Sequence, residues 1–148
     1  MTKARWKKGL GFSLWQASNT WQRAVGAVLK TCDITHVQYM LLDGIYHLSR
    51  ADARVTQICL AEYTHSDMMM VSKVLRTLVK KSLVLRADDR NDSRAKIVIL
   101  TKTGRSTLEK AQKIMAQFET QFFAEVPADA MLQSLDAIEA KSQTDTES

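Results

Sequence analysis

Features that would indicate a membrane protein or a secreted protein are missing from this sequence of 148 residues. It contains no run of eighteen apolar residues, and its first residues, MTKARWKKGLGF, lack an apolar stretch leading to a small-residue cleavage site. The only two cysteines, Cys32 and Cys59, have no spacing that suggests a disulfide framework. We therefore expect a cytoplasmic protein without a membrane segment, in which both cysteines stay reduced.

Catalytic and metal-binding patterns are missing too. The five glycines are scattered, so they form no glycine-rich phosphate loop, and neither an HExxH nor a GxSxG motif occurs. His36 and His47 would lie about 16 Å apart along a helix, which is too far for both to bind one metal ion. The sequence thus predicts a protein that is not an enzyme and binds no metal ion or cofactor.

What the sequence does contain is a concentration of positive charge in its middle. The net charge is +5, yet the segment from Lys73 to Arg105 alone holds ten basic and only three acidic residues. Residues 106–148 hold three basic and eight acidic residues. A local surplus of this size favours a polyanionic partner.

Helical periodicity surrounds the basic segment. Apolar and small residues recur every three or four positions over 12–30, which predicts a first helix. Thr35 and Gln38 have the form of a capping box at the start of a second helix, over about 36–49. A short helix is expected over 57–63. After the basic segment, the sequence predicts a long helix ending near Phe122 and a last helix that opens at Pro127.

The basic segment begins with the apolar spacing of a helix and continues with two short stretches typical of β-strands. Ser66 or Asp67 can cap a helix whose apolar stripe leaves the basic side chains on the other side. The stretches VLRA (84–87) and KIVIL (96–100) flank the turn-prone sequence DDRNDSR, which predicts a β-hairpin. A short helix, a turn, a basic helix and a basic hairpin are the layout of a winged helix-turn-helix. This layout suits DNA, because a helix fits the major groove while a hairpin reaches the neighbouring backbone or minor groove.

The region from VTQICLAEY to ILTKTG resembles the MarR (multiple antibiotic resistance regulator) family. The most specific part is DSRAKIVILTKTG, which matches the family's wing pattern at Asp92, Arg94, Leu100, Thr101 and Gly104. The resemblance covers about residues 12–140. It implies a mainly α-helical fold with a small β-hairpin wing, in one domain over 1–148. It places the winged helix-turn-helix at 35–104, dimerisation helices at 12–30 and 105–140, and a frayed tail at 141–148.

Candidate DNA-binding residues follow from the matching positions. The resemblance implies that Ser72, Lys73 and Arg76 lie on the recognition helix, and that Arg94 reaches DNA from the wing while Asp92 orients it. An ion pair between Asp92 and Arg94 that only shapes the tip is the alternative. The expected set is Met69, Ser72, Lys73, Arg76, Lys80, Arg90, Asp92 and Arg94. Phosphates would be neutralised mainly by Lys80, Lys81, Arg86 and Lys96.

Two positions depart from the family's usual pattern. Lys81-Ser82 stands where Lys-Gly is common, so a left-handed residue there would be strained, unless the turn differs. The start of the recognition helix is usually small and polar, but here it is Met68, Met69 and Met70. At most two of them can face the core. We expect Met69 to project toward DNA, where its thioether can touch a thymine methyl group, whereas core packing is the alternative.

The resemblance also implies a function: a homodimeric, ligand-responsive repressor that binds double-stranded DNA at an inverted-repeat operator. Family members commonly bind small aromatic effectors, and Trp15, Trp21, Met40 and Tyr46 are candidates to line such a pocket, although core packing explains them equally well. Two other functions stay open, a winged-helix module that binds a protein and a thiol-based redox sensor that uses Cys32. We expect Cys59 to face the core side of its short helix.

Overall fold

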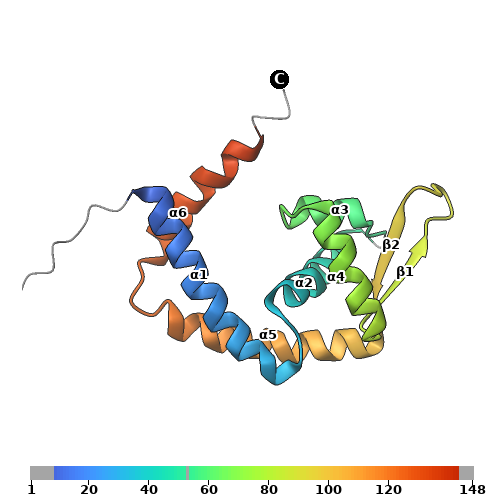
Figure 1. Ribbon diagram of the computed structural model, residues 1–148, viewed down its shortest axis with the longest axis horizontal. Coiled ribbons are helices and arrows are strands. Elements are labelled where there is room, and N and C mark those ends of the chain that lie inside the picture. Colours follow the sequence, from blue (N-terminus) through green and yellow to red (C-terminus); the bar gives the residue numbers. More distant parts are fainter. Residues whose placement is uncertain (1–8, 53, 144–148) are drawn as a thin grey trace, which may run out of the picture. The chain divides into compact units, whose positions relative to one another are not determined.

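The computed structural model describes residues 9–52 and 54–143, in two compact units that meet in the sequence at Met115 and Ala116. It confirms a mainly helical fold with one β-hairpin (Figure 1). Among the described residues, no helix is both long and apolar enough to cross a membrane. The elements are α1 (Leu10–Leu29), the 3₁₀ turn η1 (Lys30–Cys32), α2 (His36–Ala51), α3 (Gln57–Tyr63), α4 (Met68–Lys80), β1 (Val84–Asp88), β2 (Lys96–Leu100), α5 (Lys102–Phe122), α6 (Ala128–Glu139) and the 3₁₀ turn η2 (Ala140–Gln143).

Short polar side chains define where the helices of the first unit begin. The Thr35 hydroxyl accepts from the N–H of Gln38, and the Gln38 side chain accepts from the N–H of Thr35, which confirms the predicted capping box of α2. Thr56 caps α3 in a similar way. Of the two candidates before α4, Asp67 is the cap, since its carboxylate accepts from the N–H of Met70 at 3.0 Å.

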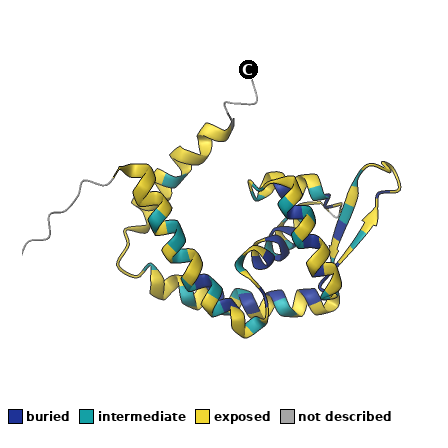
Figure 2. Cartoon of the chain, viewed as in Figure 1, coloured by how far each residue is buried: buried dark blue, intermediate teal, exposed yellow. Residues whose placement is uncertain are grey.

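The core of the first unit lies where α2, α3, α4 and the base of the hairpin meet, as the dark blue residues of Figure 2 show. The predicted apolar stripe of α4 is buried at Val71, Leu75 and Leu78. Further fully buried side chains come from the other elements: Val25, Leu29, Leu41, Leu42, Ile45, Leu60, Val84, Val98 and Leu108. Because α4 buries this stripe, its opposite side faces solvent.

The hairpin is attached to the segment before α3. Strands β1 and β2 are antiparallel, with Val84 opposite Leu100. On the other side of β2, Thr56 forms an isolated bridge with Ile97, and the N–H of Val98 donates to the carbonyl of Val55 at 2.9 Å. The wing is therefore held by backbone hydrogen bonds to the helix-turn-helix and not by its own turn alone.

The end of α4 contains a left-handed residue that is not glycine. Ser82 has φ 61°. Its N–H donates to the carbonyl of Val79, and the N–H of Leu83 donates to the carbonyl of Leu78, both at 3.0 Å. These two hydrogen bonds form a Schellman motif. The turn is thus the one that the family's glycine would make, and Ser82 adopts it at the cost of steric strain.

Replacing Ser82 with glycine should stabilise the protein by about 1 kcal/mol, because glycine adopts this conformation without a clash between Cβ and the backbone. The free energy of unfolding in urea measures the effect. Ser106→Gly is the matched control, since Ser106 is an exposed residue inside α5, where glycine should cost up to about 1 kcal/mol. A loss of stability in both variants would show that Ser82 is not strained.

His36 begins α2 in a half-buried position beside α1. Its ring meets that of Trp21 edge to face, with centroids 4.9 Å apart. The His36 Nε2 and Trp21 Nε1 atoms are both buried and have no hydrogen-bond partner among the described residues. Burial lowers the pKa of His36 below its ordinary value of 6.5, because the charged imidazolium would lose its hydration.

The protein should therefore become less stable as the pH falls below 6.5, the ordinary pKa of histidine. In that range the unfolded chain binds a proton at His36 while the folded chain does not, so protonation favours unfolding. We expect the drop in Tm between about pH 7.5 and pH 5.5 to be smaller for His36→Gln than for the wild type. His65→Gln, at an exposed histidine, controls for general effects of pH. Equal drops in the wild type and His36→Gln would contradict this assignment.

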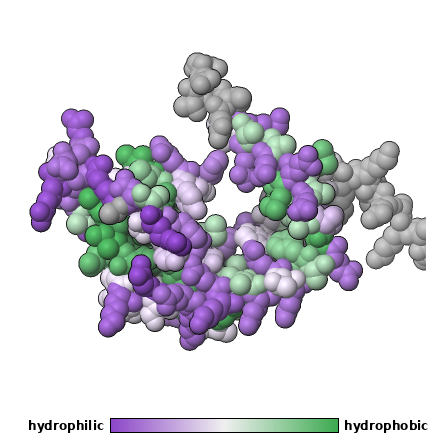
Figure 3. All heavy atoms as spheres, turned by 180° about the vertical axis from the view of Figure 1, so that it is seen from behind, coloured by the Kyte–Doolittle hydropathy of each residue, from purple (hydrophilic) through white to green (hydrophobic). Residues whose placement is uncertain are grey.

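The second unit consists of the end of α5, from Ala116, and the helix α6. No residue of α6 is buried, and Figure 3 shows green apolar atoms exposed among the purple hydrophilic ones on the chain surface. An apolar cavity of about 390 Å³ lies within this unit. It is lined by Glu119, Phe123, Val126, Ala128, Met131, Leu132 and Leu135. Of the tail expected to fray, residues 141–143 belong to η2, and 144–148 lie outside the described residues.

Candidate nucleic-acid interface

The solvent side of α4 presents three of the predicted basic residues. Lys73, Arg76 and Lys80 are exposed, and Ser72 beside them is half-buried. Within the described part of the chain, none of the three basic side chains forms an ion pair. Their charges are therefore available to an anionic partner.

The three methionines at the start of α4 differ in exposure. Met69 is 81% exposed and Met68 is 40% exposed, whereas Met70 is half-buried. The expectation that Met69 points away from the core is confirmed by its exposure. Its contact with DNA stays a prediction.

Hydrogen bonds to Asp92 shape the tip of the wing. Its Oδ1 accepts from the backbone N–H of Arg94 at 3.0 Å, and its carbonyl accepts from the N–H of Ala95 at 3.0 Å. The ion pairs of the described residues do not include Asp92 with Arg94. Asp92 thus holds the backbone that carries Arg94, and the exposed guanidinium of Arg94, like that of Arg90, remains free.

An ion pair that sequence reasoning missed also holds the wing. The Asp89 side chain is only 3% exposed, and its Oδ2 accepts from Nε of Arg54 at 2.6 Å and from Nη2 of the same arginine. Its Oδ1 accepts from the N–H of Asn91 at 3.1 Å. Arg54 precedes Asp89 by 35 residues, so no local periodicity could have predicted the pair.

Thr101 joins the end of α4 to the start of α5. Its hydroxyl donates to the carbonyl of Ser82 at 2.6 Å and accepts from the N–H of Gly104 at 2.9 Å. Its own N–H donates to the carbonyl of Leu83 at 3.1 Å. A Cβ on Gly104 would lie 2.8 Å from the carbonyl carbon of Leu83, so only glycine fits. The Leu-Thr-x-x-Gly part of the wing pattern therefore has a structural role at the base of the hairpin.

Three of the four residues expected to neutralise phosphates also form contacts within the chain. Lys81 donates to the carbonyl of Asp33 and lies 3.8 Å from its carboxylate, so it anchors α4 to the loop before α2. Lys96 forms an ion pair with Asp88, and Arg86 donates to the side chain of Gln57 at 3.4 Å. The carboxylates of Asp33 and Asp88 offset part of the charge of Lys81 and Lys96, whereas Arg86 keeps its full charge because Gln57 is neutral.

The four candidate effector residues lie on α1 and α2. Trp15 is 62% exposed and Met40 is 40% exposed, while Trp21 packs against His36. The ring of Tyr46 lies under the guanidinium groups of Arg50 and Arg105, at 5.8 and 6.0 Å from its centroid.

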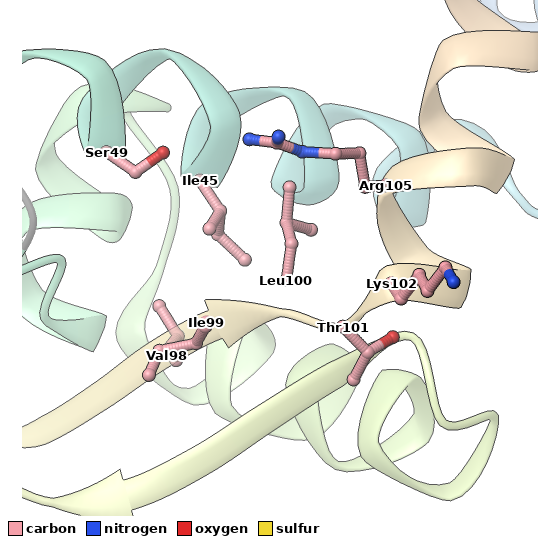
Figure 4. Close-up of a pocket in the computed structure, with 8 residues that line it drawn as sticks. All are labelled: Ile45, Ser49, Val98, Ile99, Leu100, Thr101, Lys102 and Arg105. Carbon is pink, nitrogen blue, oxygen red and sulfur yellow. The ribbon is translucent and has the colours of Figure 1, made fainter.

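An open cleft of about 560 Å³ lies between α2, β2 and α5 (Figure 4). The Arg105 side chain connects Tyr46 to this cleft, because it lines the cleft and its guanidinium lies over the Tyr46 ring. In the figure it extends over Leu100. The cleft is lined by Ile45, Ser49, Val98, Ile99, Leu100, Thr101, Lys102 and Arg105. Of the predicted effector residues, Tyr46 is therefore the one that the geometry associates with this cleft.

The cysteines and potential metal ligands add little to the site. Cys59 is exposed, which corrects the expectation that it faces the core. Cys32 is half-buried, and its Sγ lies 3.9 Å from the Thr31 hydroxyl. Over the residues described, no three His, Cys, Asp or Glu side chains are grouped closely enough to hold a metal ion.

Comparison with known proteins agrees with this geometry. The sequence profile of the MarR family matches residues 34–96. The chain is 40% identical over 114 residues to the uncharacterized HTH-type transcriptional regulator YdcH of Bacillus subtilis, covering 77% of this chain and 78% of that protein. It is also similar to a crystal structure of a mutant MarR from E. coli complexed with operator DNA, with a TM-score of 0.74, 25% identity, and coverage of 90% and 92% of the two chains. For a complex of S. aureus MepR with DNA, the TM-score is 0.75 at 22% identity, with coverage of 92% and 96%. The chain therefore belongs to the MarR family of winged helix-turn-helix transcriptional regulators.

Proposed function

We propose that the protein is a sequence-specific DNA-binding regulator, and that it acts as a homodimeric, ligand-responsive repressor at an inverted-repeat operator without catalytic activity of its own. The observation that carries this proposal is the set of free cations on two neighbouring elements. Lys73, Arg76 and Lys80 are exposed on α4, and Arg90 and Arg94 are exposed at the tip of the wing. The similar E. coli and S. aureus structures are themselves complexes with DNA.

Each element would contact a different part of the duplex. Helix α4 would lie in the major groove, where Lys73 and Arg76 meet base edges and phosphates together with Ser72. The wing would place Arg94, and with it Arg90, on the flank of the site. Lys80, at the last turn of α4, would mainly neutralise phosphate charge.

Exposed apolar side chains support a homodimer. In α1 they gather in the first turns, at Leu10, Phe12, Leu14 and Trp15, which are between 43% and 92% exposed. In α6 they are Met131, Leu132 and Ile138, which are between 37% and 57% exposed. Apolar surface of this kind marks an interface. A second copy would cover it, and two-fold symmetry would present two recognition helices to successive major grooves.

Fluorescence anisotropy tests the proposal. The purified protein is titrated onto duplexes tiled across its own upstream region, with random duplex as competitor and the salt concentration varied. We expect one duplex to bind more tightly than random DNA by about 10³-fold or more, with a steep dependence on salt. Weak affinity that is the same on every duplex and on a random-sequence library would contradict sequence-specific binding. Small aromatic compounds can be screened in the same assay for release of the duplex.

Met69 offers a test at the level of one methyl group. If its thioether contacts a thymine methyl, replacing that thymine with uracil should weaken binding by the wild type about 3-fold to 4-fold, the value of one buried methyl group. Met69→Ala should bind both duplexes equally. Because Met69 is 81% exposed, the variant should keep the stability of the wild type. An unchanged preference for thymine in Met69→Ala would assign that preference to another residue.

A further inference from the structure

The segment between α2 and α3 connects the helix-turn-helix to the wing. Thr56 caps α3 by accepting from the N–H of Cys59, and the same residue bridges to Ile97 of β2. Val55 beside it accepts from Val98, also of β2. Because α3 packs against α4, this segment links the recognition helix α4, through α3, to the hairpin.

Arg54 extends this attachment from the strands to the tip of the wing. It directs two N–H groups onto one oxygen of the Asp89 carboxylate, whose other oxygen accepts from the N–H of Asn91. The N–H of Asp89 donates to the carbonyl of Ala95 at 3.1 Å and closes the loop. Arg54 therefore anchors, through Asp89, the loop that carries Arg90 and Arg94.

Burial and charge show what this pair contributes. The Asp89 side chain is 3% exposed, and a carboxylate that loses its hydration needs a partner of opposite charge. The two charges cancel each other before any DNA arrives, and both nitrogen contacts direct Arg54 to Asp89 instead of to a phosphate. The pair thus fixes the position of the wing tip but adds no net charge to the interface.

We propose that Arg54 is a positioning residue for DNA recognition. By holding Asp89, it fixes the distance between α4 and the tip of the wing, so that Arg94 meets its part of the site while α4 occupies the major groove. This inference rests on the proposed function. Arg94 is the residue that touches DNA, and Arg54 acts through it.

A double-mutant cycle distinguishes positioning from general stabilisation. Affinities for the specific duplex and for random duplex are measured with Arg54→Met, Arg94→Ala and the double variant. We expect Arg54→Met to lower the ratio of specific to random affinity about 10-fold. Arg94→Ala should add little further loss in the Arg54→Met background, because Arg94 is already displaced. Losses that multiply in full would overturn the proposal.

Lys73 provides the matched control for this cycle. It lies on α4 and is independent of the wing tip, so Lys73→Ala should weaken binding by the same factor with and without Arg54→Met. If Arg54→Met reduced the effects of Lys73→Ala and Arg94→Ala alike, its role would be that of a general structural residue, and the proposal would fail.

Two further substitutions keep the test decisive if Arg54→Met does not fold. Asp89→Asn removes a negative charge, so charge alone would tighten binding to every duplex. We expect it instead to weaken binding to the specific duplex about 10-fold while leaving random duplex equal or tighter. Arg54→Lys keeps the charge but lacks the planar fork, and it should retain part of the specificity. An Asp89→Asn variant that bound both duplexes more tightly would overturn the proposal.

Hydrogen exchange of the DNA-free protein separates this inference from the proposed function. In Arg54→Met, the amides of Asn91, Arg94 and Ala95 should exchange faster, while the buried amides of α4 keep the rates of the wild type. Unchanged exchange at the wing tip would overturn the positioning role even if the wild type binds DNA specifically. Faster exchange in a protein without any specific duplex would leave the pair as the anchor of the wing and remove only the proposed function.

Discussion

Gly104→Ala should destabilise the protein by about 3 kcal/mol. The new Cβ would lie 2.8 Å from the carbonyl carbon of Leu83 and 3.2 Å from its Cα. These are backbone atoms, so no change of rotamer can move them away. The Leu83 carbonyl also accepts from the N–H of Thr101. Relief of the clash therefore requires α5 to separate from the base of the wing.

Gly26→Ala is the matched control for this substitution. Gly26 lies inside α1, and a Cβ there meets nothing within 4 Å. Alanine should raise stability at that position by about 0.5–1 kcal/mol, because it favours the helix. Thermal unfolding measures both variants, and a loss of about 3 kcal/mol corresponds to a Tm lower by roughly 6–12 °C in a protein of this size. If Gly104→Ala were as stable as Gly26→Ala, Leu83 and Gly104 would not be in close contact.

Arg94→Ala should weaken binding to the specific duplex about 10-fold to 100-fold. The Arg94 guanidinium is exposed and unpaired, while Asp92 accepts from its backbone N–H at 3.0 Å, so a free guanidinium is presented to DNA from an ordered backbone. Affinity for random duplex should fall less, because that affinity depends on the total charge of the surface.

Arg94→Lys separates the charge of this residue from its shape. Lysine keeps the positive charge but cannot donate two parallel hydrogen bonds to one acceptor group. The variant should therefore bind random duplex like the wild type and should lose affinity for the specific duplex. If Arg94→Lys retained full specificity, Arg94 would act only as a point charge. If Arg94→Ala retained the affinity of the wild type, the wing tip would not contact DNA.

Local patterns in the sequence predicted most of the fold. The capping box at Thr35, the buried stripe of α4 and the hairpin each depend on residues that are close in the sequence, and each was confirmed. Helical geometry predicted that at least one of the three methionines is exposed, since three consecutive side chains cannot all face one core, and the choice of Met69 was a hypothesis that its exposure confirms.

Local sequence patterns could not predict contacts between residues that are distant in the sequence. The pair of Arg54 with Asp89 and the bond from Lys81 to Asp33 join residues that are 35 and 48 positions apart. Charge counting placed Lys81 in the cationic segment although it contacts Asp33, and it left Arg54 outside that segment although Arg54 holds the wing. Cys59 was assigned to the core side of α3, but that helix has only seven residues, too few for its apolar side to be identified reliably from periodicity.

If two copies of α4 and the wing read a specific DNA sequence, selection of bound duplexes from a randomised pool should reveal it. We expect an enriched inverted repeat whose half-sites lie about one helical turn apart, roughly 10 bp centre to centre, and a weaker or shorter consensus for Arg94→Ala. Enriched duplexes that share no sequence, or a single half-site without its symmetric partner, would contradict this expectation.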